Sequence, residues 1–196
     1  MKKSILIFLL CFATFQISQA QKITQEDYKS IIPFLQAEDW KSAYKMSSKL
    51  LEKASADTSE YKTMVAYFNI YAAAGMTSEN NMSRKKLNEV VGKYKGQPIF
   101  MAGHLASKDG KNTLNKTFLS TTDGKSNGFT IITNRTLKII LLEDIALAKP
   151  VDPAFYAGST VRCGGTLKEL EVNPDKNNND WIIKLTISNG FIRRTK

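Results

Sequence analysis

The chain has 196 residues and carries 28 basic and 18 acidic side chains, for a net charge of +10. This length excludes a large multi-domain enzyme and fits one ordinary domain or two small ones. A single histidine excludes a histidine-rich metal site, and two cysteines exclude a disulfide-rich scaffold.

Residues 1–20 predict a cleavable secretory signal. Two lysines precede an apolar run over residues 5–15, and Ser18 and Ala20 provide small side chains at the expected cleavage site. The apolar run is too short to span a bilayer. We therefore expect an exported protein, periplasmic or at the cell surface of a Gram-negative-like bacterium, whose mature chain begins at Gln21 and has no transmembrane segment.

The mature chain is basic and has one cysteine. Without residues 1–20, 26 basic and 18 acidic side chains remain, and the net charge is +8. This charge attracts anionic partners without specificity, although a solvated lysine-rich surface is the simpler explanation. Cys163 alternates with Val161 on the apolar face of a predicted strand, which indicates a buried, inert thiol.

Residues 21–96 have the apolar spacing of helices. Thr24 and Asp27 have the spacing of a capping box that begins a first helix, and Pro33 is expected to kink or end it. Asp39 is placed to cap a second helix that runs to about Lys53.

A third helix has the clearest pattern. Asp57 and Glu60 have the spacing of a capping box, and Gly75 is expected to end the helix. A fourth helix is expected from Ser78 to about Lys95, so that residues 21–96 form antiparallel hairpins. The apolar side chains of the third helix recur at spacings of three and four: Tyr61, Met64, Val65, Phe68, Tyr71 and Ala72.

From residue 97 onward the apolar period is two, which predicts strands. These are expected over residues 99–107, 113–119, 129–133, 136–145, 159–172 and 181–187. Turn signals stand at Asp109-Gly110, Asp123-Gly124, Asn127-Gly128 and Asn189-Gly190. Asp152 and Pro153 predict the N-cap and first residue of a short helix, and Gly164-Gly165 predicts a bulge.

The predicted fold is α+β: N-terminal helical hairpins packed on a C-terminal antiparallel β-barrel with one short helix, with residues 21–96 and 97–196 as the two parts. The run from Glu38 to Ala43, with Leu50 and Leu51 following, resembles the second helix of a tetratricopeptide repeat (TPR). This resemblance covers residues 24–96 at most and implies a protein-interaction surface.

The element order over residues 98–194 resembles an OB-fold: a long first strand that bends, two further strands, a short helix and two last strands. OB-folds bind oligosaccharides or oligonucleotides on a strand face, so the resemblance implies a ligand face on the β part. A small barrel of another topology, or a sandwich, would give the same order of elements.

Few residues point to catalysis. His104 is a candidate partner for a nucleophile, but no G-x-S-x-G turn accompanies it. Glu169 and Glu171 would share one strand face and are a candidate acid and base pair, although solvated charge is the simpler explanation. No glycine-rich phosphate loop is present, so no cofactor is expected.

The candidate anion-binding residues are Arg135, Lys138 and Arg162, on the predicted strands. Aromatic residues at alternate strand positions usually fill a core, so nucleic acid is not the expected partner. We expect a non-enzymatic exported binding or scaffold protein whose partner is another cell-envelope protein or an anionic polymer. The alternatives are an OB-like module for an acidic glycan, lipid headgroup or nucleic acid, and an unrecognised hydrolase.

Overall fold

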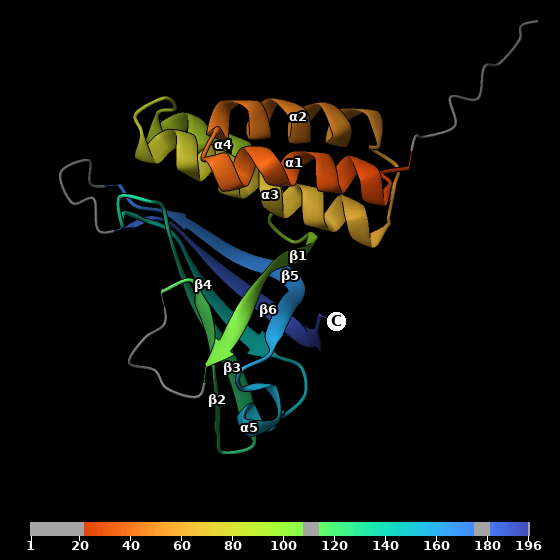
Figure 1. The fold of residues 1–196 in the computed structure, drawn as a ribbon, viewed down its shortest axis with the longest axis vertical. Coiled ribbons are helices and arrows are strands. Elements are labelled where there is room, and N and C mark those ends of the chain that lie inside the picture. The colour runs from red at the N-terminus through yellow and green to blue at the C-terminus, as the bar shows by residue number, and fades with distance from the viewer. Residues whose placement is uncertain (1–21, 108–113, 175–180, 196) are drawn as a thin grey trace, which may run out of the picture.

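The computed structural model describes residues 22–107, 114–174 and 181–195, so the predicted signal and the Asp109-Gly110 turn lie outside it. A layer of helices lies over one end of a β-sheet (Figure 1). The helices are α1 (Gln25–Ala37), α2 (Trp40–Lys53), α3 (Glu60–Ser78), α4 (Arg84–Gly92) and α5 (Pro153–Tyr156). The strands are β1 (Pro98–Ser107), β2 (Lys116–Thr122), β3 (Lys125–Thr133), β4 (Ile139–Leu147), β5 (Thr160–Val172) and β6 (Trp181–Arg194).

The six strands form one mixed sheet that closes into an irregular ring. Their order is β1-β2-β3-β4-β6-β5, and β5 pairs back onto β1. The β1–β2 and β4–β6 pairs are parallel, and the other four pairs are antiparallel. The α+β class and the packing of N-terminal helices on a mostly antiparallel sheet are therefore confirmed.

Short-range capping signals are confirmed with one exception. Thr24 and Asp27 form the expected capping box, and Asp39 accepts the Ser42 N–H at the start of α2. Ser59 caps α3 in place of Asp57. The Asp57 carboxylate instead accepts the Ile23 N–H at 2.8 Å, because it is buried where the N-terminal segment crosses the start of α3.

Pro33, expected to kink or end a helix, and Gly75, expected to end one, both lie inside helices. Pro33 is within α1, which continues to Ala37 and ends at Glu38 in the left-handed region. Pro33 is exposed, so water can satisfy the carbonyl that loses its helical partner. Gly75 lies inside α3, where it makes room for the Trp40 side chain: a Cβ at this position would stand 2.2 Å from Cδ2 of the buried indole.

Of the turns predicted in the described β part, one is confirmed and two are wrong. Asp123-Gly124 makes the β2–β3 turn, with φ angles of 51° and 71°. Asn127-Gly128 and Asn189-Gly190 lie inside β3 and β6, so these two predicted turns are wrong. At Asn189 the φ of 50° and a shift in β4–β6 register bend β6 without ending it. The bulge at Gly164-Gly165 is confirmed.

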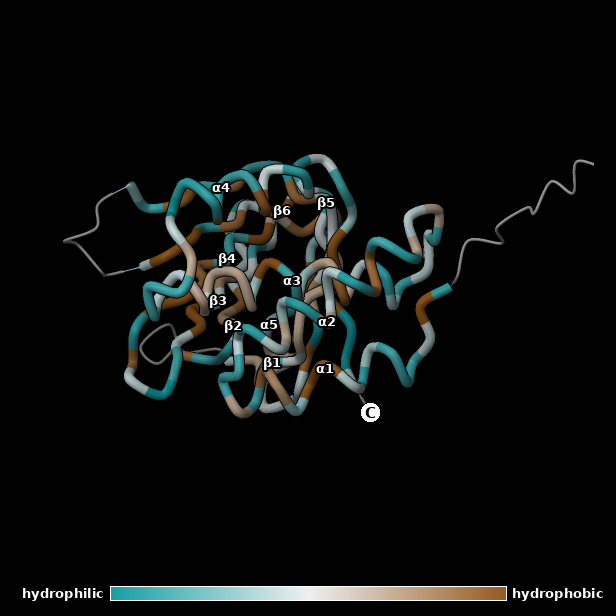
Figure 2. Tube along the Cα trace, turned by 90° about the horizontal axis from the view of Figure 1, so that it is seen from above, coloured by the Kyte–Doolittle hydropathy of each residue, from teal (hydrophilic) through white to brown (hydrophobic). Residues whose placement is uncertain are grey.

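One hydrophobic core runs from the helices into the ring. Trp40 and Phe68 of the helices belong to the same buried cluster as Leu141 and Leu185 of the strands. Figure 2 shows hydrophobic segments along the strands and hydrophilic segments around the rim of the molecule. The core includes Cys163, which is a free, buried thiol as predicted.

Gly75→Ala should destabilise the protein by about 1 to 3 kcal/mol, because the added methyl group overpacks the indole of Trp40. Gly92→Ala is the matched control. A Cβ at Gly92 meets nothing within 4 Å, so alanine should stabilise α4 by up to about 1 kcal/mol. Urea unfolding of both variants measures the two effects, and equal effects would contradict the contact between Gly75 and Trp40.

Candidate functional site

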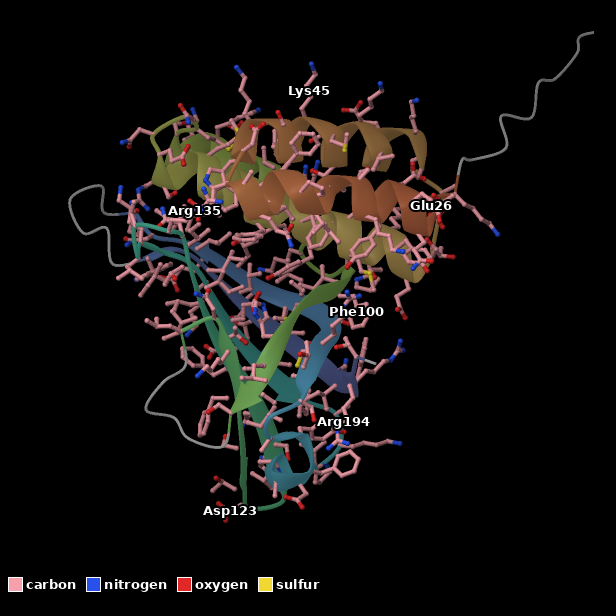
Figure 3. All side chains as sticks on the ribbon, in the orientation of Figure 1. Glu26, Lys45, Phe100, Asp123, Arg135 and Arg194 are labelled. Atoms are coloured by element: carbon pink, nitrogen blue, oxygen red, sulfur yellow. The ribbon has the colours of Figure 1, made fainter. Side chains whose placement is uncertain are left out.

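Two of the predicted anion-binding residues, Arg135 and Lys138, lie at the junction of helices and ring, where Arg135 is labelled in Figure 3. The Arg135 Nη2 donates to the Gln36 carbonyl at 2.7 Å, and the Lys138 Nζ donates to the Ser78 carbonyl at 3.2 Å. These carbonyls belong to the last turns of α1 and α3, which lack helical N–H donors. Arg135 and Lys138 therefore attach the β3–β4 turn to the helices.

The third residue, Arg162, contacts the beginnings of these helices. Its Nη2 donates to the Tyr28 hydroxyl at 2.7 Å, and its guanidinium lies over the Tyr28 ring, 5.6 Å from the centroid. The Arg162 Nη1 approaches the Met64 sulfur at 3.6 Å. Arg162 thus lies near the opposite end of α1 from Arg135 and Lys138, and the three side chains do not converge on one ligand.

A different set of basic residues gathers around a groove of about 970 Å³ on the helices. We call this surface the lysine groove. Its walls are α2 and the segment from Lys93 to Pro98, and residues of α3 lie between them. Lys45 extends away from the ring, on the opposite side of the helical layer from Arg135 (Figure 3). The basic residues of the groove are Lys41, Lys45, Lys49, Lys62 and Lys93.

A buried hydrogen-bond network fixes the walls of the lysine groove. The fully buried Asn69 on α3 donates through Nδ2 to the hydroxyls of Ser47 and Ser48 on α2, at 2.9 and 2.8 Å. Its Oδ1 accepts from the Tyr94 hydroxyl at 2.8 Å. One amide therefore holds α2 and the Tyr94 segment at a set separation, so the groove is already formed without a ligand.

The charge of the groove is positive and largely uncompensated. Five lysines line it against two carboxylates, Glu52 and Asp57, which leaves a formal charge of +3. The Asp57 carboxylate already accepts hydrogen bonds from the backbone N–H groups of Ile23 and Ser59. None of the ion pairs within the described ranges involves a groove lysine. Sequence reasoning missed this groove, although the four-residue spacing of three lysines on α2 was the available signal.

A carboxyl group is buried where α3 meets the ring. Glu143 on β4 is fully buried, and its Oε1 accepts the Tyr67 hydroxyl of α3 at 2.7 Å. Its Oε2 is buried without a hydrogen-bond partner. Thr130 stands opposite Glu143 on β3, and its hydroxyl lies 3.1 Å from that of Thr117 on β2. The interior of the ring therefore holds a polar row across three adjacent strands.

Burial controls the ionisation of Glu143 and of the nearby Cys163. Removal from water raises the pKa of Glu143 to about 8, and interactions with the hydroxyls of Tyr67 and Thr130 oppose only part of that rise. The carboxyl is therefore mostly neutral at pH 7. Burial, with the nearby Glu143, also raises the pKa of Cys163 to about 12. Cys163 is thus a thiol with little nucleophilic character.

The residues proposed for catalysis are not assembled into a recognisable centre. The His104 Nε2 is buried without a partner, and burial lowers the pKa of this imidazole. Glu169 is exposed and lies 3.7 Å from the Lys168 ammonium. Within the described ranges, no group of three or more His, Cys, Asp or Glu side chains is arranged to hold a metal ion.

The outer face of the ring carries a shallow hollow of about 420 Å³. Phe118 and Phe129 form a cross-strand pair beside it, and Asp144 lines it together with Thr186. The lining residues include no lysine or arginine. Asp144 itself is paired with Lys184 at 2.7 Å. This face offers aromatic surface and hydroxyl groups, with little attraction for an anionic polymer.

Comparison with known proteins adds no relative: no family model, curated protein or solved structure matches the chain. Among the residues placed by the structure, no helix has the length and apolar character needed to cross a membrane.

Glu143→Gln should stabilise the protein more at high pH than at low pH. The carboxyl has a pKa of about 8 when folded and 4.5 in its ordinary state. Its contribution to stability is therefore fully present below about pH 4.5 and is lost as the pH rises through about 8. Relative to the glutamine variant, the wild-type free energy of unfolding should fall by up to about 1.4 kcal/mol per pH unit in this window.

Urea unfolding at about pH 5 and about pH 8 measures this difference. Glu169→Gln removes an exposed carboxylate and should leave the pH dependence of the wild type unchanged. A difference between wild type and Glu143→Gln that is the same at both pH values would contradict the buried neutral carboxyl.

Proposed function

We propose that the protein is an exported, non-enzymatic binding protein whose lysine groove docks an acidic segment of a partner protein. The observation that supports this most directly is the combination of a preformed groove of about 970 Å³ with five lysines that form no ion pair within the described ranges. A concave surface of this size with a net positive charge attracts and orients a ligand of the opposite sign.

The arrangement of the lysines suits a polypeptide. Lys41, Lys45 and Lys49 follow one another at four-residue intervals along α2. At about 1.5 Å per residue they form a row about 12 Å long, with steps of about 6 Å. Acidic side chains four residues apart on a partner helix have the same spacing. Lys62 and Lys93 provide positive charge away from this row.

Apolar surface within the groove favours a protein over a purely polar polyanion. Besides the lysines, the groove is lined by the partly exposed apolar side chains of Tyr44, Leu51 and Met76. An amphipathic segment can place apolar side chains on this surface while its carboxylates meet the ammonium groups. This is the mode in which a helix or an extended peptide docks in a groove between helices.

The packing of the helices is consistent with a TPR-like arrangement, which we include in the proposal. The α1/α2 and α3/α4 hairpins follow each other along the chain, and α3 packs against both α1 and α2. TPR-like units commonly serve as surfaces for protein segments. The described part of the chain holds two such hairpins, and the ring lies beneath them (Figure 1).

We further propose that the ring is an OB-like module. If β1 and β2 are two segments of one interrupted first strand, β1 pairs with β5 and β2 pairs with β3. In this count β4 is the third strand and β6 the last, and the two are parallel. The short helix α5 then lies between the third strand, β4, and the fourth strand, β5. An anionic ligand on this module is the alternative function, but the outer hollow has no basic lining residue to support it.

A peptide of about 12 residues that repeats Glu-Glu-Leu should bind the mature protein, and its Gln-Gln-Leu counterpart should bind much more weakly. Replacing Lys41, Lys45 and Lys49 together by Gln should weaken binding of the acidic peptide by about tenfold or more, because it removes one wall of positive charge. Fluorescence anisotropy with labelled peptides at low and moderate salt measures both effects.

The matched control replaces three exposed lysines of the ring part, Lys125, Lys149 and Lys168, by Gln. It changes the net charge equally and should alter the affinity by less than about twofold. Equal losses in both triple variants would show diffuse attraction by net charge and would contradict docking in the groove. Groove-dependent binding to phosphatidylglycerol vesicles, with no binding of the peptide, would assign the groove to a lipid surface instead.

Export is the second part of the proposal and is tested separately. The small side chains of Ser18 and Ala20 should direct cleavage before Gln21. The intact mass of the protein recovered from the cell envelope should therefore correspond to residues 21–196. A mass that retains Met1 would contradict export through this signal.

A further inference from the structure

A second concave site lies at the junction of helices and ring, on the other side of α3 from the lysine groove. This junction cleft has a volume of about 580 Å³ and is formed by α1, α3, β1 and β5. Tyr28, Leu35 and Phe68 provide its buried apolar lining. Arg162 of β5 is the one charged residue among those that line it.

Arg162 has no counter-ion in the part of the chain that the structure places. None of the ion pairs there involves it, and no lining residue of the junction cleft is acidic. The Tyr28 hydroxyl and the Met64 sulfur satisfy two of its N–H groups, while Nε is buried without any partner. A half-buried cation with an unpaired donor is costly unless an acceptor approaches it.

The neighbouring Arg193, unlike Arg162, is paired with a carboxylate. Arg193 stands opposite Arg162 across the β5–β6 pair, and its Nη1 lies 2.6 Å from the Glu60 carboxylate. The fold therefore supplies a carboxylate to one of two adjacent arginines and none to the other. A ligand carboxylate at Arg162 would complete the same pairing.

The chain also leaves space beside Arg162. Gly103 pairs with Arg162 across β1 and β5, and a Cβ at Gly103 would lie 3.2 Å from the Thr160 Cγ2 and 3.6 Å from the Arg162 Nε. Any side chain larger than hydrogen would therefore extend over the guanidinium. The φ of Gly103 is not in the left-handed region, so the backbone alone does not require glycine there.

We propose that the junction cleft binds a small organic carboxylate with an apolar body, whose carboxylate pairs with Arg162 while its body lies against Phe68, Leu35 and Ile32. A planar guanidinium matches a carboxylate through two parallel hydrogen bonds. One cation compensates one negative charge, which favours a monoanionic carboxylate over a doubly charged phosphate. The hydroxyls of Thr160 and Thr195 are the remaining polar groups at the rim on the strand side.

Calorimetric titration of the mature protein with 4-phenylbutanoate tests the assignment. We expect saturable binding of one molecule per chain and much weaker binding of the neutral analogue 4-phenylbutan-1-ol. Arg162→Gln should weaken binding of 4-phenylbutanoate by about tenfold or more, because it removes the charge that pairs with the carboxylate. Arg193→Gln is the matched control and should change the affinity by less than about twofold, since Arg193 is already paired with Glu60.

Because Arg162 also holds Tyr28, its replacement can lower stability, and Gly103→Val provides a second test. This variant keeps the charge but fills the space beside the guanidinium, so it should weaken 4-phenylbutanoate binding while circular dichroism shows an unchanged fold. Equal binding of the acid and the alcohol, or unchanged binding by Arg162→Gln, would overturn the proposal. Tighter binding of phenyl phosphate than of 4-phenylbutanoate would overturn its assignment to a carboxylate. None of these outcomes depends on the lysine groove.

Discussion

The contact between Tyr67 and Glu143 is the constraint on which the relation of helices to ring depends. Tyr67 is fully buried on α3, and its hydroxyl reaches a carboxyl group inside the ring at 2.7 Å. A buried carboxyl is tolerable only when it is neutral or paired, so this contact favours one position of α3 over the ring end. Nearly every residue of α3 from Met64 to Ser78 is buried, which is what a helix between a second helical layer and a sheet requires.

The cations at the junction follow from this position of α3. Arg135 and Lys138 bind carbonyls at the ends of α1 and α3, and Arg162 binds a hydroxyl near the start of α1. Residues that look available for ligands in the sequence therefore hold the helices in place. Apart from Arg162, whose Nε has no partner, the positive charge that is left for a partner lies on the far side of the helical layer, on α2 and around it.

Local signals predicted local structure well and long-range contacts poorly. The caps at Thr24, Asp39 and Asp152 involve atoms two or three residues apart, so they can be recognised in the sequence. Gly75 was misinterpreted as a helix stop. Glycine is needed there because the Trp40 ring packs on the α3 backbone, and Trp40 is 35 positions earlier in the chain. Asn189-Gly190 has the sequence of a turn, yet β6 continues through it because both β4 and β5 pair with β6 there.

The candidate sites show the same limit. Three lysines of the groove are four residues apart on one helix and could be found by spacing, but Lys62 and Lys93 join them only through the packing of α3 and the Asn69 network. The special position of Arg162 depends on Tyr28, 134 residues earlier, and on the missing side chain at Gly103.

Both proposed sites border α3 and also β1, which contributes Pro98 to the lysine groove and Gly103 to the junction cleft. Thr63 and Ala66 contribute to the lysine groove, while Phe68 and Tyr71 contribute to the junction cleft. For a ligand in one site to affect the other through these elements, α3 or β1 would have to shift or rotate. Trp40 against Gly75 and Tyr67 against Glu143 oppose such a movement from the two sides of the helix. Because packed cores resist continuous deformation, the structure favours two independent sites on one rigid body over coupled binding.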